Sequence, residues 1–260
     1  MAREARVPVA ARDRELFDGI AERYARKDLL PASRIARRER LLRTLEAVPD
    51  LPERPAILEI GCGAGFTADY LEGRFGSYLG IDHSHRLIEL AHQRHAGGAA
   101  RFEVADAAAL EASSGWDLVV MIGVLHHLED PLAVLRTARR LLCPGGWVAA
   151  NEPQPANPVI QLARALRKRI DPAYSEDQCT LSAGRLRSLL EAAGFDSIRI
   201  APQGLVSTPF AEVPAPVQWL TAPLARLACR ADRLLERPAA VARWLSWNLV
   251  AAGRRPPEQA

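Results

Sequence analysis

The stretch Ile57-Leu-Glu-Ile-Gly-Cys-Gly-Ala-Gly65 runs from a short apolar segment into three glycines at alternate positions. Residues 57–60 predict a buried β-strand. Gly61, Gly63 and Gly65 predict a turn whose backbone angles other residues adopt only at a cost, and which lets bare backbone approach a ligand. The stretch therefore predicts an open α/β sheet with a cofactor at the end of its first strand.

The glycine spacing separates two classes of cofactor. A nicotinamide dinucleotide site uses the pattern G-x-G-x-x-G, in which a helix N-terminus faces a pyrophosphate. Here the position that this pattern reserves for its last glycine or alanine carries Phe66. Glu59, two positions before the first glycine, can face a cationic ligand. The sequence thus favours a cationic cofactor over a dinucleotide, and a strand-to-helix turn with no ligand is the other alternative.

Length, composition and charge are those of an ordinary globular protein. The chain has 260 residues and a formal net charge of +3, which is too small to indicate nucleic-acid binding by itself. Its four cysteines form no C-x-x-C pair, so we expect neither a metal site nor a disulfide framework. Residues 1–14 lack the apolar core of a secretory signal, and no apolar run is long enough to cross a bilayer. We therefore expect a cytoplasmic protein.

Strand and helix patterns alternate along the chain. Such alternation predicts parallel strands joined by right-handed crossovers. The expected fold is a Rossmann-like, mostly parallel, seven-stranded α/β sheet with helices on both faces. The expected strands are 56–60, 78–81, 101–104, 117–122, 147–151, 196–200 and 247–252, and the main helices between them 67–74, 84–95, 131–142 and 182–193.

Helical periodicity also precedes the first strand. Leu16, Ile20 and Tyr24 recur four residues apart, and this predicts a helical segment that packs across the mouth of the cofactor site. The expected parts of the chain are a helical N-terminal cap (1–50), the cofactor-binding core (51–200), an insertion before the last strand (201–246), and the last strand with the tail (247–260).

Five further motifs follow the glycine stretch in order. They are Gly80-Ile-Asp82, Val104-Ala-Asp-Ala107, Trp116–Val120 with Val124–Leu128, Leu141–Trp147, and Leu189–Phe195. Each alone is weak, whereas the ordered series is specific. The series resembles that of the class I S-adenosylmethionine (SAM)-dependent methyltransferases, of the bacterial small-molecule type. The resemblance covers residues 15–200 and the last strand.

The resemblance implies where SAM would bind. Asp82, at the end of the second strand, would accept both ribose hydroxyls, and Asp106 would hold the adenine amino group. For each, an aspartate in a turn or a helix cap is the structural alternative. The residues expected to bind the cofactor are Glu59, Gly61, Cys62, Gly63, Gly65, Asp82, His83, Asp106, Ala107 and Ile122.

Methyl transfer to oxygen needs few protein groups besides a base. The displaced carbon is already activated by the sulfonium, but a hydroxyl acceptor must lose its proton. His126 and His127 follow the fourth strand at the edge where such sheets bind ligands, and one of the two is a candidate general base. Alternatively, both histidines bond to backbone or orient a loop. Tyr24 and Glu152 are candidate acceptor-binding residues, although Glu152 could equally pair with an arginine.

The expected acceptor is a small molecule with a hydroxyl group. Methyltransferases that act on exocyclic nitrogens often carry Asn/Asp-Pro-Pro-aromatic after the fourth strand, whereas this chain has Ile122-Gly-Val-Leu125 there. Clustered arginines at residues 34–43 keep a tRNA or rRNA acceptor as an alternative, though a solvated helix face has the same composition. A non-catalytic SAM- or metabolite-binding protein is a further alternative, because methyl transfer has no obligatory catalytic side chain.

Residues 216–245, within the insertion, have an amphipathic pattern. Thr221 is expected to cap a helix that has Pro223 in its first turn. The pattern predicts either a lid whose leucines pack on the catalytic domain, or a helix that lies on an anionic membrane. The leucine stripe is Leu220, Leu224, Leu227 and Leu234, and the arginine stripe is Arg226, Arg230, Arg233 and Arg237.

Overall fold

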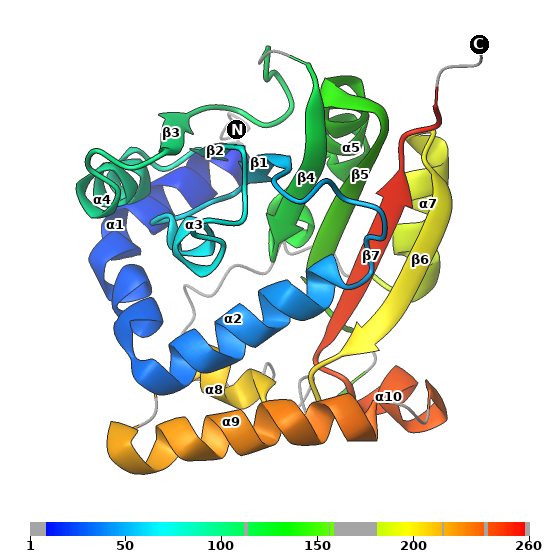
Figure 1. Cartoon of the computed structure of the whole chain (residues 1–260). Helices are drawn as coiled ribbons and strands as arrows, with labels where there is room; N and C mark the ends of the chain where they lie inside the picture. The colour runs from blue at the N-terminus through cyan, green and yellow to red at the C-terminus, as the bar shows by residue number, and fades with distance from the viewer. Residues whose placement is uncertain are drawn as a thin grey trace, which may run out of the picture.

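A seven-stranded sheet forms the centre of the molecule (Figure 1). The computed structural model describes residues 9–111, 114–155, 157–158, 181–214, 216–236 and 239–257, so Cys179 and Arg237 lie outside the described residues. The strand order is β3-β2-β1-β4-β5-β7-β6, and β7 alone runs antiparallel to its neighbours. The strands are β1 (Ala56–Ile60), β2 (Ser77–Asp82), β3 (Ala100–Val104), β4 (Trp116–Ile122), β5 (Leu142–Pro153), β6 (Asp196–Gln203) and β7 (Asn248–Arg254).

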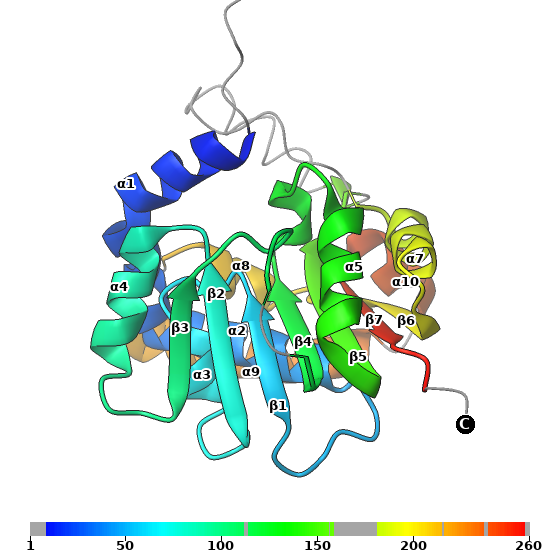
Figure 2. The ribbon, with the colours of Figure 1, turned by 90° about the horizontal axis from the view of Figure 1, so that it is seen from above.

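Helices cover both faces of this sheet (Figure 2). Successive strand residues point to opposite faces, so Leu58 packs into one apolar core and Ile57 into the other. The expected Rossmann-like architecture is confirmed. One face carries α5 (Pro131–Leu141) and α7 (Ala183–Ala192); the other carries α2 (Pro31–Leu45), α3 (Phe66–Tyr70) and α4 (His85–Arg94), while α1 (Val9–Leu29) lies beside the carboxyl ends of the strands.

Element boundaries follow the local chemistry of the chain. Ser84 and Ser182 cap α4 and α7 as expected, because each hydroxyl accepts a backbone N–H three residues later. Helix α3 ends at Tyr70, short of the expected 67–74, before Gly73 with its positive φ of 74°. Strand β5 is longer than expected and includes the Pro-Gly-Gly segment at its start.

The described residues of the insertion before β7 form three helices: α8 (Thr208–Glu212), α9 (Gln218–Leu235) and α10 (Ala239–Leu245). The expected cap at Thr221 is wrong, because α9 begins at Gln218 after Val217, whose backbone is left-handed. Helix α9 packs on α2 and forms a third layer outside the sheet (Figure 1). None of the described helices is both long and apolar enough to span a bilayer.

The packing of α9 differs from that expected of a leucine-packed lid. Its buried positions are small or polar, whereas its leucines face outward. No described residue of 201–246 lines either of the two pockets discussed below. The alternative in which these leucines pack on the catalytic domain is therefore wrong, because the small side chains of α9 face α2 and its leucines are exposed. The buried positions are Ala222, Ala225, Cys229 and Asp232.

Candidate active site

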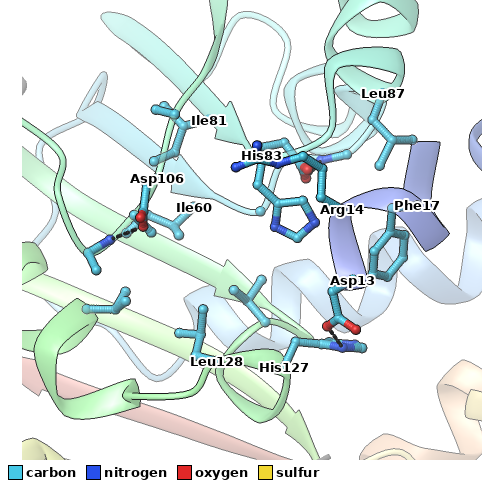
Figure 3. Close-up of a pocket in the computed structure, with 18 of the residues that line it drawn as sticks. Asp13, Arg14, Phe17, Ile60, Ile81, His83, Leu87, Asp106, His127 and Leu128 are labelled. Atoms are coloured by element: carbon cyan, nitrogen blue, oxygen red, sulfur yellow. Dashed lines mark hydrogen bonds and ion pairs between the residues drawn. The ribbon is translucent and has the colours of Figure 1, made fainter. Parts of the chain in front are cut away.

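A pocket of about 300 Å³ lies at the carboxyl ends of β1, β2 and β4 (Figure 3). The glycine turn, the ends of these strands and the loop after β3 form its walls, and α1 closes one side. Open α/β sheets bind ligands at this edge. Nine of the residues expected from the sequence line it: Tyr24, Gly61, Gly63, Asp82, His83, Asp106, Ala107, Ile122 and His127.

The glycine turn exposes bare backbone to the pocket. All three glycines have positive φ, which L side chains rarely adopt. A β-carbon on Gly61 would lie 2.4 Å from Val124 Cγ2, so a side chain there would collide with the loop after β4. Gly65 lines neither pocket and instead precedes α3. The turn thus fits a ligand that passes close to the main chain.

The two aspartates hold the turns that form the pocket. Asp82 Oδ2 accepts the Gly63 N–H at 2.9 Å, and its Oδ1 accepts the Ser84 N–H at 2.9 Å. Asp106 Oδ1 accepts the Ala108 N–H at 2.9 Å. Both aspartates therefore hydrogen-bond to backbone N–H groups of turns, as the alternative role of a turn aspartate predicts. Both also line the pocket. Carboxylate oxygens accept more than one hydrogen bond, so a ligand hydroxyl or amino group can be added.

Beside Asp82, His83 contributes an unsatisfied polar atom. Its Nε2 is buried and has no hydrogen-bond partner among the described residues. Buried polar groups normally have a partner, and an orphan needs an explanation. Because His83 lines the pocket and points into it (Figure 3), a bound polar ligand would provide one.

His126 and His127 have different partners. His127 lines the pocket, and its Nδ1 lies 3.1 Å from Asp13 Oδ2 (Figure 3). An ionised carboxylate can only accept, so Nδ1 carries the proton, and in a neutral ring Nε2 is then free to act as a base. His126 lies outside the pocket lining, with its Nδ1 2.7 Å from Glu152 Oε2.

Glu152 is an internal anchor of the loop after β4. Its side chain is fully buried and lines neither pocket. Its carboxylate accepts the backbone N–H groups of Val124 and Leu125 at 3.0 and 2.9 Å, besides facing His126. The expected contact with an acceptor is therefore wrong, because the two backbone N–H groups occupy Oε1 and the N–H group and ring of His126 occupy Oε2.

A second, smaller chamber of about 70 Å³ adjoins the pocket across the glycine turn. Arg37 Nη1 binds Asp28 Oδ2 at 3.0 Å and its Nε donates to the Ala211 carbonyl at 3.0 Å. Burial would lower the pKa of Arg37, but Asp28 beside it raises the pKa above its ordinary value. Two buried polar atoms of the chamber, Arg40 Nε and Tyr70 Oη, have no partner among the described residues. The chamber is therefore polar and offers two hydrogen-bond donors that a ligand could use.

Glu59 lines the smaller chamber, together with Cys62. Its carboxylate accepts the hydroxyl of the buried Tyr78. Burial raises the pKa of Glu59 to about 7. A cation next to this carboxylate would favour its ionised form, as the expected contact with a cationic ligand requires.

Tyr24 apart, sequence reasoning missed the residues that helices α1 and α2 contribute. Asp13, Arg14 and Phe17 line the pocket from α1, and Arg37 and Arg40 line the chamber from α2. The helical periodicity located α1 beside the cofactor mouth, as the structure confirms. It gave no signal for these individual polar residues, because their partners are distant in sequence; Asp13 and His127 are 114 positions apart.

The family follows from a comparison of the sequence with known domains. Residues 33–200 match the model of the methyltransferase domain, which is more than half of the chain. The chain belongs to the methyltransferase-domain family. The matched range contains the glycine turn, both aspartates and both histidines, so the ordered motifs indicated the right family.

Relatives of this methyltransferase-family protein include ubiquinone biosynthesis O-methyltransferases. That of Leptothrix cholodnii is 34% identical over 98 residues, which cover 35% of this chain and 41% of the relative. That of Pseudomonas aeruginosa is 34% identical over 96 residues, with the same coverage. The matched segment thus spans less than half the length of these relatives.

Solved structures share the fold of this methyltransferase-family protein. A SAM-dependent methyltransferase from Thermotoga maritima has a TM-score of 0.62 at 18% identity and covers 93% of this chain and 99% of its own. A Haloferax volcanii protein solved with the Trm112 methyltransferase activator has a TM-score of 0.64 at 20% identity, covering 95% of this chain and 99% of its own. At this identity the likeness establishes the fold alone.

Proposed function

We propose that this protein transfers a methyl group from SAM to a hydroxyl oxygen of a small molecule, with His127 as general base. The observation that carries the proposal is the pair His127–Asp13, because it opens on the same pocket as the glycine turn, Asp82 and Asp106. A base and a nucleoside-binding edge in one pocket match the needs of oxygen methylation.

The residues present fit SAM along the length of the two cavities. Asp82 and the orphaned His83 Nε2 suit the ribose hydroxyls, and Asp106 suits the adenine amino group. The smaller chamber suits the amino acid end, because Arg40 Nε and Tyr70 Oη have no partner there. When bound, SAM supplies a methyl group on a positively charged sulfur.

The protein's own groups handle the acceptor's proton. His127 Nε2 takes the proton from the hydroxyl as the oxygen attacks, and Asp13 stabilises the imidazolium that results. Phe17 packs edge-on against His127, with ring centroids 5.6 Å apart. Asp13 acts through His127 and is a positioning residue.

A small hydroxyl-bearing acceptor agrees better with the surroundings than nucleic acid does. The relatives' names describe O-methylation, and the clustered arginines of α2 are largely used inside the protein. Arg37 pairs with Asp28, Arg40 with Glu212 and Arg43 with Glu236. Paired arginines are poorly available to phosphates. We place the activity in the cytoplasm, with residues 216–245 as the segment that would reach a membrane.

Product formation tests the proposal. The purified protein is incubated with SAM and a panel of phenolic and aliphatic alcohols, and S-adenosylhomocysteine is measured by mass spectrometry. We expect its release with at least one hydroxyl compound, and a matching methylated product. Binding of SAM without release in the presence of the panel or of a metabolite extract would favour the non-catalytic alternative. Release with tRNA or rRNA alone would favour a nucleic-acid acceptor.

A further inference from the structure

Helix α9 lies on the protein with its small side chains inward and its large apolar side chains outward. Its buried positions, which include Ala225 and Cys229, recur three and four residues apart and face α2. Leu220, Leu227 and Leu234 are seven apart and lie on the opposite side of the helix. Leu227 is 57% exposed and Leu234 is 62% exposed.

Two large aromatic side chains of α9 and α10 are also exposed. Trp219, at the start of α9, is 79% exposed, and Trp244, near the end of α10, is 59% exposed. A surface helix of a soluble protein normally turns its apolar stripe to the core. A contiguous exposed apolar patch marks an interaction site. We name the exposed large apolar side chains of α9 the leucine face: Trp219, Leu220, Leu224, Leu227, Leu234 and Leu235.

The charges beside the leucine face are positive. Arg226 and Arg230 are exposed and make no ion pair or hydrogen bond within the described part of the chain. The acidic residue of α9, Asp232, is buried and bound to the backbone of residues 205–207. The exposed surface of α9 therefore consists of apolar side chains flanked by arginines, without a free carboxylate.

We infer that the leucine face lies on an anionic lipid bilayer. Leucines inserted at the boundary of headgroups and acyl chains leave Arg226 and Arg230 at the level of the phosphates, and Trp219 has the amphipathic ring that favours this depth. A two-fold contact between antiparallel α9 helices of two copies would instead place both arginine rows on the same side, where they repel. The charge pattern thus favours an anionic surface over an antiparallel contact with a second copy.

Flotation of the full chain with lipid vesicles tests the inference. Vesicles of phosphatidylcholine alone are compared with vesicles that contain phosphatidylglycerol, at low and high salt. We expect flotation with the anionic vesicles only, and its loss in the variant L224Q/L227Q. The variant R226Q/R230Q should bind at least tenfold more weakly, since each arginine near an anionic surface contributes about fivefold. The matched control R185Q/R187Q, on exposed positions of α7, should bind like the wild type.

Results of two kinds would overturn the inference. One is the absence of vesicle binding, or binding that L224Q/L227Q leaves unchanged. The other is a concentration-dependent dimer, seen by analytical ultracentrifugation, that L224Q/L227Q converts to a monomer without any effect of lipid. Calorimetric binding of SAM, unchanged in each variant, reports that the fold is intact. The inference does not depend on methyl transfer, so that failure in the product assay leaves the vesicle result valid.

Discussion

At the level of single residues, His126 and His127 are neighbours with opposite surroundings. His127 faces the pocket and Asp13, whereas His126 is tied to the buried Glu152. The sequence left open which histidine is the base, because a motif that contains two adjacent histidines does not show which of them faces the pocket. The contact with Asp13 comes from a helix far away in the chain, and it favours His127.

Replacement of His127 by alanine should lower kcat by about 100-fold, the usual loss when a general base is removed. SAM affinity, measured by calorimetry, should change little. The variant D13N should also lower kcat and shift the pH profile, because an amide no longer fixes the proton on Nδ1. The matched control is H126N, which should retain most of kcat. Equal turnover of H127A and the wild type would remove this histidine from the mechanism.

Glu59 should make stability depend on pH. Burial raises its pKa to about 7 from an ordinary value of 4.5, so the folded state binds its proton more tightly than the unfolded state does. This contribution to the free energy of unfolding is complete below pH 4.5 and is lost as the pH rises to about 7. Thermal unfolding of the ligand-free protein should therefore show a decline in Tm over this range, and E59Q should flatten it.

The exposed residue Glu53 provides the control for this experiment. The variant E53Q should retain the wild-type slope. If the Tm of E59Q falls with pH as steeply as that of the wild type, Glu59 does not cause the decline. The folded protein would then not raise the pKa of Glu59.

At the level of elements, Asp232 ties α9 to the loop before α8. Its carboxylate accepts the N–H groups of Leu205, Val206 and Ser207 at 3.1, 2.7 and 3.1 Å. These hydrogen bonds, rather than the leucines, hold the helix in place. The other side chains on its inward face are small. The orientation of α9 is thus determined by a polar anchor that the leucine periodicity does not reveal.

Alanine at position 232 would leave buried N–H groups unpaired. We expect a loss of at least about 2 kcal/mol in the free energy of unfolding, and hence a fall in Tm of about 4–8 °C. Differential scanning calorimetry measures this fall. The variant E191A, at an exposed position of α7, should unfold like the wild type. A D232A protein of unchanged Tm would show that the loop finds other partners and that α9 is held by its apolar contacts alone.

At the level of the whole molecule, the sheet and the cofactor edge could be predicted, whereas the closure of the site could not. The seven strands and the family follow from local patterns such as residues 57–65 and Gly80-Ile-Asp82, in which the turn chemistry lies within a few residues. The roles of Asp13 and Arg37 depend on how α1 and α2 dock, and docking joins segments that no short motif links. The outward orientation of the α9 leucines could not be predicted for the same reason, because it depends on how α9 docks on α2.

The proposed binding of SAM in the two cavities should raise the stability of the whole molecule. A ligand that binds the folded state at 100 times its Kd adds about 2.7 kcal/mol, which corresponds to a rise in Tm of about 5–10 °C for a chain of this size. We expect this rise with SAM and with S-adenosylhomocysteine, and none with a nicotinamide dinucleotide, because Phe66 occupies the position of its last glycine. The variant D82A should lose most of the shift, since Asp82 both binds Gly63 and faces the pocket. A shift with the dinucleotide alone would mean that the pocket is complementary to a pyrophosphate rather than to a sulfonium.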